Sequence, residues 1–152
     1  MRRIDALLAD YGSSHRTRGN LICHAVGITL IVFGVLVMLR TFRVAGPWTA
    51  AEPVLALVAA VYVLLDVPLG LATVAVLVLL DLAARAVPHW GWGAAAFVVG
   101  WIFQGVGHAV YEKKSPAFLR NLAHLLVGPA FLVNEALRIH RPAPAALNKK
   151  SS

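Results

Sequence analysis

Three polar side chains recur every four residues in an otherwise apolar stretch of the chain: Gln104, His108 and Glu112. On an α-helix this spacing places the three side chains on one face. Polar and ionisable side chains are costly inside a membrane helix, so they need hydrogen-bonding partners or a metal ion. The stretch therefore predicts that other polar groups of the chain meet this helix face.

A second group of polar residues lies near the start of the chain. Asn20 and His24 are four residues apart, and His15 precedes them. Imidazole binds Zn, Fe, Cu and Ni, and polar groups around a metal site orient its histidines. The candidate metal ligands are His15, His24, His108, His124 and Glu112, and the candidate orienting groups are Asn20 and Gln104. The alternative is that each histidine only packs helices together or lies at the membrane surface.

The composition is that of an integral membrane protein. Of the 152 residues, 59% are hydrophobic and 14% are charged, whereas a soluble domain is about 45–50% apolar and about 25% charged. The net charge of +7 comes from basic residues at the ends of apolar runs, which favours contact with anionic lipid over nucleic acid binding. Cys23 is the only cysteine, which excludes an intrachain disulfide and a cysteine-ligated metal cluster.

The apolar runs predict an all-α helical bundle with about four transmembrane helices. They cover residues 21–39, 53–87 and 93–112, and a helix of about 20 residues crosses the hydrocarbon core. The middle run is too long for one span. Its Asp66, Pro68 and Gly70 predict a tight turn between two helices, because proline and glycine interrupt helices.

Two further helices are expected beside the spans. Residues 1–12 carry their apolar side chains on one face, which is typical of a helix that lies on the membrane surface. Residues 116–139 are more polar than a typical span, so we expect a re-entrant or interfacial helix there, with a fifth span as the alternative. We expect one membrane-embedded domain over residues 1–140 and a disordered tail over residues 141–152.

The distribution of basic residues predicts the orientation of the chain. With four spans and both termini in the cytoplasm, the outer loops hold only Arg40, Arg43 and Arg85, which agrees with the positive-inside rule. Asp81, in the third span, is then a pairing or capping residue near the outer surface. The Ala-, Leu- and Arg-rich composition favours a bacterial cytoplasmic membrane.

This topology decides which histidines can meet. The inner ends of the first and fourth spans bring His24 and His108 to the same side of the membrane, together with His15 and His124. His89 falls on the opposite side, and His140 is expected to be solvated in the tail.

Two motifs together resemble a known family of small membrane proteins. The first is His15-x4-Asn20-x3-His24-x2-Gly27, with Tyr11 upstream. The second is Gly100-Trp-Ile-Phe-Gln104-x2-Gly107-His108-x3-Glu112, which continues to Pro116-Ala117 and Asn121-Leu122. Over residues 5–139 the chain is similar to the Mpo-type 2-hydroxy fatty acid dioxygenases, formerly a domain of unknown function, whose named member takes part in converting phytosphingosine to odd-chain fatty acids.

The resemblance implies an Fe(II)-dependent dioxygenase that uses O2 to remove the carboxyl carbon of a 2-hydroxy fatty acid, which is α-oxidation. It implies that His15, His24 and His108 hold the iron. Glu112 matches the motif as either a ligand or a group that orients ligands, and His124 departs from the family pattern and ranks below the other three. The expected partners are the 2-hydroxy fatty acid, O2 and the lipid bilayer, with the oligomeric state left open.

Two other functions remain as alternatives. One is a small non-enzymatic membrane protein or transporter, and the other is a zinc-dependent lipid hydrolase. The polar groups gather at one depth of the membrane rather than along a continuous path, which argues against a pore.

Overall fold

The computed structural model describes residues 3–13, 15, 17–112 and 123–140. Its elements are, in chain order, α1 (Arg3–Ser13), α2 (Arg18–Leu39), β1 (Arg43–Ala45), β2 (Trp48–Thr49), α3 (Ala51–Leu65), α4 (Val67–Arg85), α5 (Trp90–Val106), the π-helical segment η1 (Gly107–Glu112) and α6 (Ala123–Leu137). The predicted loop after the first span is a short antiparallel hairpin of β1 and β2, with Gly46 at a positive φ of 51°. The all-α membrane bundle predicted from the sequence is confirmed in its fold class.

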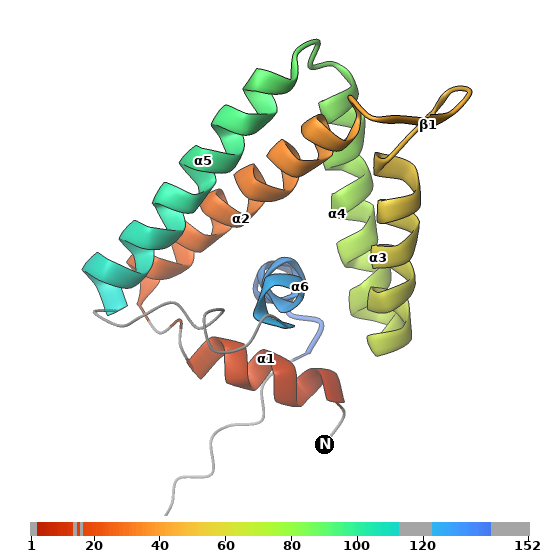
Figure 1. Ribbon diagram of the computed structural model, residues 1–152. Coiled ribbons are helices and arrows are strands. Elements are labelled where there is room, and N and C mark those ends of the chain that lie inside the picture. The colour runs from red at the N-terminus through yellow and green to blue at the C-terminus, as the bar shows by residue number, and fades with distance from the viewer. Residues whose placement is uncertain (1–2, 14, 16, 113–122, 141–152) are drawn as a thin grey trace, which may run out of the picture.

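The helices form two pairs that enclose a third layer. Figure 1 shows α2 beside α5 and α3 beside α4, with α6 between the two pairs and α1 beneath it. The view looks almost along the axis of α6, whereas the paired helices lie across it. Helix α6 therefore crosses the pairs instead of running along them as a fifth span would.

Two glycine pairs bring α2 and α5 into close contact. A Cβ atom on Gly100 would lie 2.7 Å from the backbone oxygen of Gly27, and one on Gly27 would lie 2.8 Å from the oxygen of Gly100. Gly34 and Gly93 make the same kind of approach further along the helices. Small residues allow such backbone contact between membrane helices, so these glycines set the spacing of the pair that carries His24 and His108.

The predicted turn between the two middle helices is confirmed. Asp66 caps α4 by accepting a hydrogen bond from the Leu69 backbone N–H at 3.0 Å, and Pro68 lies in the first turn, where its missing N–H costs nothing. A Cβ atom on Gly70 would collide with the backbone of Tyr62. The turn is therefore tight and returns the chain directly along α3.

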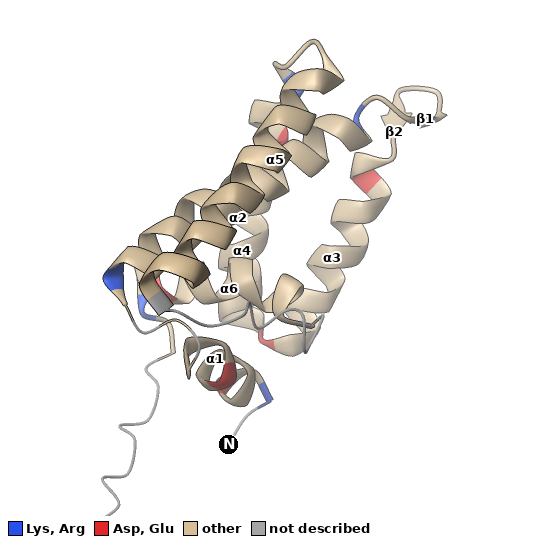
Figure 2. Cartoon of the chain, turned by 60° about the vertical axis from the view of Figure 1, so that its left-hand side comes forward, with Lys and Arg blue, Asp and Glu red and all other residues tan. Residues whose placement is uncertain are grey.

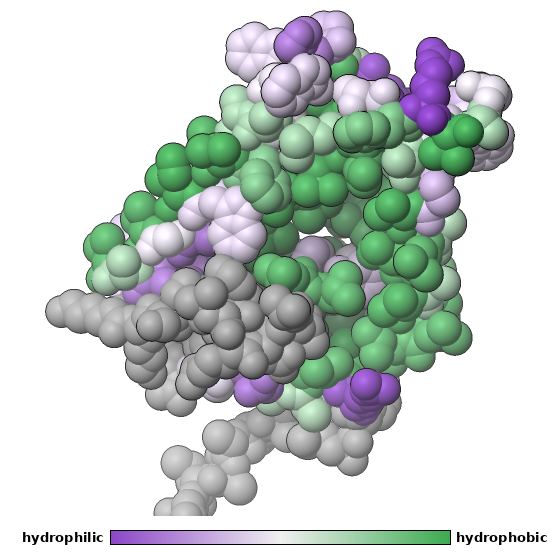
Figure 3. Space-filling model, viewed as in Figure 1, coloured by the Kyte–Doolittle hydropathy of each residue, from purple (hydrophilic) through white to green (hydrophobic). Residues whose placement is uncertain are grey.

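Three of the described helices are long and apolar enough to cross a membrane: α2, α4, and α5 together with η1 up to Tyr111. Helix α3 has 15 residues, about 22 Å at 1.5 Å per residue, so the second predicted span is the short one. Apolar residues cover much of the helix surface on the face shown in Figure 3. Charged residues lie near the helix ends in Figure 2, as expected for a chain surrounded by lipid.

An ion-pair network closes the end of the bundle that carries the hairpin. The Arg40 guanidinium donates to both oxygens of Asp81 and also pairs with Glu52 at 3.2 Å, while Arg85 reaches Asp81 at 3.3 Å. Asp81 is buried. The interpretation of Asp81 as a pairing residue is thus confirmed, and the network ties α2, α3 and α4 together.

The amphipathic face of α1 packs on α6. Ile4, Leu8 and Tyr11 are buried in one apolar cluster with Val127 and Phe131 of α6. The apolar side chains of α1 therefore contact another helix of the protein.

The expectation that His140 is solvated is wrong. His140 is 8% exposed, and its Nε2 lies 2.9 Å from an Asp66 carboxylate oxygen. The Asn134 side chain accepts from the His140 N–H and donates to its carbonyl, which folds the chain back after α6. Long-range pairing of this kind leaves no local signal in the sequence. The predicted disordered tail, residues 141–152, lies outside the described residues.

Candidate metal centre

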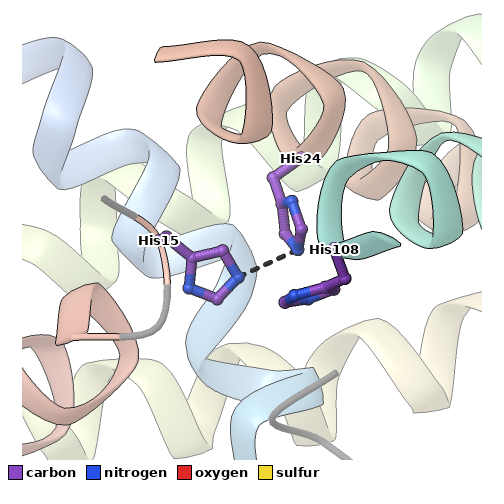
Figure 4. Close-up of side chains that lie close together, drawn as sticks. All are labelled: His15, His24 and His108. Carbon is purple, nitrogen blue, oxygen red and sulfur yellow. Dashed lines mark hydrogen bonds between the residues drawn. The ribbon is translucent and has the colours of Figure 1, made fainter. Parts of the chain in front are cut away.

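Three histidines from separate parts of the chain meet at one end of the bundle. His15 lies between α1 and α2, His24 is on α2, and His108 is in η1. One ring nitrogen from each lies within 4.8 Å of the others, and all three residues are buried. Figure 4 shows the rings facing one another. These are the three histidines that the first and second motifs predicted to come together.

Two of the rings have their tautomers set by the backbone. The Nδ1 of His15 lies 2.7 Å from the carbonyl oxygen of Tyr11, and the Nδ1 of His24 lies 3.0 Å from that of Asn20. A carbonyl oxygen only accepts, so both Nδ1 atoms donate. In the neutral rings both Nε2 atoms therefore carry lone pairs.

These two Nε2 atoms lie 2.9 Å apart. Two lone pairs at this distance repel unless a proton or a metal ion lies between them. Neighbouring imidazole nitrogens on one metal ion, each about 2.1 Å from it and at right angles, are about 3.0 Å apart. A backbone carbonyl that orients the second ring nitrogen is also usual for metal-binding histidines. The donor set therefore fits a transition-metal ion.

The third histidine is carried by an uncommon helical segment. Helix α5 changes from α- to π-helical at Gly107, and His108 is the second residue of η1. A Cβ atom on Gly107 would collide with the side-chain oxygen of Asn20, which is fully buried on α2. Single π-turns are rare and often occur at functional sites. Asn20 thus contributes its backbone to His24 and its side chain to the contact with η1.

The other candidate residues have different positions. Gln104 is buried on α5 and lines the same cavity as the histidines, and so does His124. His124 pairs through Nε2 with Asp10 at 2.8 Å and is not one of the three histidines that converge. Glu112 ends η1, and its side chain lies outside the described part of the chain. Its role as a ligand stays a prediction.

His89 is separated from this centre, as the topology predicted. It caps the start of α5, where its Nδ1 accepts from the Gly91 N–H at 3.1 Å. The start of α5 lies at the far end of the α2–α5 pair from η1 (Figure 1).

A cavity of about 320 Å³ opens beside the three histidines. Most of its wall is apolar, and its polar groups belong to four histidines, Gln104, Tyr11 and the indole of Trp101. The lining residues are Tyr11, His15, His24, Ile28, Ile31, Val32, Phe97, Trp101, Gln104, His108, His124, Leu125, Gly128 and Pro129. The cavity therefore suits a ligand with a polar head and an apolar chain.

Tyr11 also belongs to this candidate centre, although the sequence did not predict it. Its ring stacks on His15 with 4.2 Å between centroids and an interplanar angle of 8°. Its carbonyl oxygen orients the same histidine. The first motif does place Tyr11 four residues before His15. Tyr11 also fits the apolar face of the helix over residues 1–12, so the spacing alone gave no reason to assign it to the site.

Comparisons with known proteins agree with one another. A family model described as 2-hydroxy-palmitic acid dioxygenase Mpo1-like matches residues 1–139. The chain is similar to the 2-hydroxy-palmitic acid dioxygenase MPO1 of Saccharomyces cerevisiae, with 33% identity over 134 residues, which cover 86% of this chain and 77% of the yeast protein. No solved structure matches the chain.

Proposed function

The chain belongs to the Mpo1-like family of 2-hydroxy-palmitic acid dioxygenases, and we propose that it oxidises 2-hydroxy fatty acids with O2 at the centre formed by His15, His24 and His108. The observation that carries this proposal is the 2.9 Å approach of two Nε2 atoms whose rings are both fixed by backbone carbonyls, on the wall of an apolar cavity. The family match supports the class of reaction, and the geometry supports the choice of these three residues.

Iron is the metal that suits this reaction class. Zinc has no redox chemistry, whereas non-haem Fe(II) oxygenases hold the metal with few protein ligands and leave positions open. His15, His24 and His108 would hold the ion, with Glu112 as a further candidate. When bound, Fe(II) would supply the redox chemistry with O2 and a Lewis acid for the carboxylate and 2-hydroxyl of the substrate.

The proposed reaction shortens the acid by one carbon. The C1–C2 bond breaks, the original carboxyl carbon leaves as CO2, and C2 becomes the carboxyl carbon of the product. The substrate is oxidised and O2 is reduced. One oxygen atom of O2 enters the new carboxyl group, and the other leaves as water with the two hydrogens released from C2 and its hydroxyl.

The residues of the chain bind and orient the reactants. The carbonyls of Tyr11 and Asn20 hold the two histidine rings with their Nε2 atoms turned to the centre. Ile28, Ile31 and Phe97 line the apolar part of the cavity, where the acyl chain would lie. Each buried methylene contributes about 0.8 kcal/mol, so burial of the acyl chain supplies binding energy. The apolar wall also keeps water from the head group of the fatty acid.

Metal analysis tests the centre. Protein is expressed with iron and purified anaerobically as wild type, His24→Ala and the matched control His89→Ala, and bound metals are quantified. We expect stoichiometric iron in the wild type and in His89→Ala, because His89 lies at the other end of α5, and little or no iron in His24→Ala. Equal iron in all three proteins, or zinc as the tightly bound metal, would contradict the proposal and favour the hydrolase alternative.

We also propose that the histidine end of the bundle faces the cytoplasm of a bacterial cell. The basic residues of the sequence support this orientation, because most of them lie on the same side as the two termini in a four-span topology. Single cysteines are placed in a Cys23→Ser protein, at the exposed position 44 in the hairpin or at position 150 near the C-terminus, and are labelled with a membrane-impermeant reagent on intact cells. We expect labelling at position 44 alone.

A further inference from the structure

Tyr11 uses its ring and its backbone to support the candidate metal centre, which leaves its hydroxyl group to be explained. The ring stacks on His15, meets the edge of His124 at 5.5 Å, and contacts Phe131 at 4.8 Å between centroids. The carbonyl accepts from His15. None of these contacts requires a phenol, because a phenylalanine would make all of them.

The hydroxyl of Tyr11 has no hydrogen-bonding partner among the residues that the structure describes, although Tyr11 is only 5% exposed. Tyr62 offers a direct comparison, because it is 4% exposed and donates to the carbonyl of Leu126 at 2.6 Å. The hydroxyl oxygen is not among the fully shielded polar atoms of the described residues, so it is open to the cavity, where a hydroxyl without a partner is unfavourable. The Tyr11 hydroxyl is therefore free to form a hydrogen bond with a ligand that enters the cavity.

The surroundings of this hydroxyl locate that partner in the cavity. A Cβ atom on Gly128 would lie 3.2 Å from the hydroxyl oxygen of Tyr11 and 2.9 Å from the Cδ1 of Ile28. Tyr11, Gly128 and Ile28 all line the cavity. A side chain at position 128 would crowd both groups, so the glycine lets the hydroxyl lie against α6 at the point where the apolar wall of the cavity begins.

Gln104, which lines the same cavity, carries a second donor. The amide Nε2 of Gln104 has no partner among the described residues, and Gln104 is 6% exposed. The phenol of Tyr11 is also a donor at neutral pH, because a phenol loses its proton only at about pH 10. A carboxylate only accepts hydrogen bonds and has several lone pairs to offer. The Tyr11 hydroxyl and the Gln104 amide, two donors without acceptors, therefore complement a carboxylate.

We propose that the hydroxyl of Tyr11, with the amide of Gln104 as a second donor, binds the carboxylate of the fatty acid and holds the head group beside His15. This inference rests on the proposed function for the class of ligand. It adds a substrate-binding role for two residues outside the histidine set, and it explains why the residue that stacks on His15 is a tyrosine.

The experiment measures binding of 2-hydroxypalmitate and of its methyl ester to iron-loaded protein in detergent, without O2 so that no turnover occurs. The proteins are wild type, Tyr11→Phe and the matched control Tyr62→Phe, which also loses a buried hydroxyl but lies outside the cavity. A hydrogen bond to a charged group corresponds to about 10- to 100-fold in affinity. We expect Tyr11→Phe to bind the acid more weakly by this factor, with iron content unchanged, and Tyr62→Phe to bind it as wild type does.

The methyl ester separates a carboxylate contact from a general effect on the site. We expect wild type to bind the ester more weakly than the acid, and Tyr11→Phe to bind the ester as well as wild type does. If wild type binds the acid and Tyr11→Phe binds it equally well, the inference is wrong and the proposed function stands. Loss of iron from Tyr11→Phe would also overturn it, because the hydroxyl would then serve the metal centre. If wild type binds no 2-hydroxy acid, the proposed function fails first and the inference with it.

Discussion

Adding one methyl group at Gly100 should separate α2 from α5 and disturb the metal centre. The Cβ of Gly100→Ala would lie 2.7 Å from the Gly27 oxygen and 2.7 Å from a side-chain carbon of Ile31. Ordinary contact begins at 3.4 Å, so the helices must move apart by about 0.7 Å. Overpacking of this kind typically costs about 1–3 kcal/mol.

The same displacement acts on the ligands, because His24 is on α2 and His108 follows α5 directly. Metal–ligand distances tolerate changes of only about 0.2 Å. We therefore expect Gly100→Ala to lose both stability and iron affinity, even though Gly100 is two helical turns from His108. A stability loss alone would be expected if the contact only packed the helices.

Gly105→Ala is the matched control for this prediction. Gly105 is on the same helix, and nothing lies within 4 Å of a Cβ atom built there. Both substitutions gain the same helix propensity, about 1 kcal/mol, so the difference between them isolates the contact with α2. The assay is denaturant unfolding in detergent micelles, followed by measurement of bound iron. Equal stability and equal iron content in the two variants would refute the close packing and its link to the metal centre.

Three further predictions concern contacts away from the three histidines. Asp81→Asn should destabilise the protein by about 3 kcal/mol in the same unfolding assay, because Arg40 would lose its main partner while only 14% exposed; an unchanged stability would mean that Glu52 alone satisfies Arg40. Tyr62→Phe should lose about 1 kcal/mol, since the Leu126 carbonyl loses its donor, and it should keep wild-type turnover; a fall in turnover per folded protein would contradict its purely structural place. His140→Ala should lose about 1–3 kcal/mol and increase protease cleavage after α6, because it removes the contact with Asp66; cleavage at the wild-type rate would argue that Asn134 suffices to hold the segment.

The positions of the membrane helices were predictable because they depend on composition averaged over many residues. The run over residues 21–39 appears as α2, and the interruption at Asp66 appears as the turn before α4. The convergence of His24 and His108 followed from topology, because helices that cross the same bilayer place their inner ends at one depth. These inferences need only hydropathy and the reversal of direction at each crossing.

The details that shape the centre depend on contacts that no local pattern records. The π-helical turn that carries His108 begins at Gly107, and the fully buried side chain of Asn20 packs against this glycine. These two residues are 87 positions apart in the sequence. On a regular α-helix Gln104, His108 and Glu112 would stack, but a π-turn changes the spacing after Gly107. The burial of His140 by Asp66 is likewise a long-range pairing. Sequence spacing alone could locate none of these.

The most direct test of the central claim is O2 consumption by anaerobically purified, iron-loaded protein after addition of 2-hydroxypalmitate, with palmitate as the control acid. We predict O2 uptake only with the 2-hydroxy acid, loss of this uptake in His24→Ala, and a fatty acid one carbon shorter as the product. An iron-loaded protein that binds 2-hydroxypalmitate and consumes no O2, or that forms a product of unchanged chain length, would contradict the account.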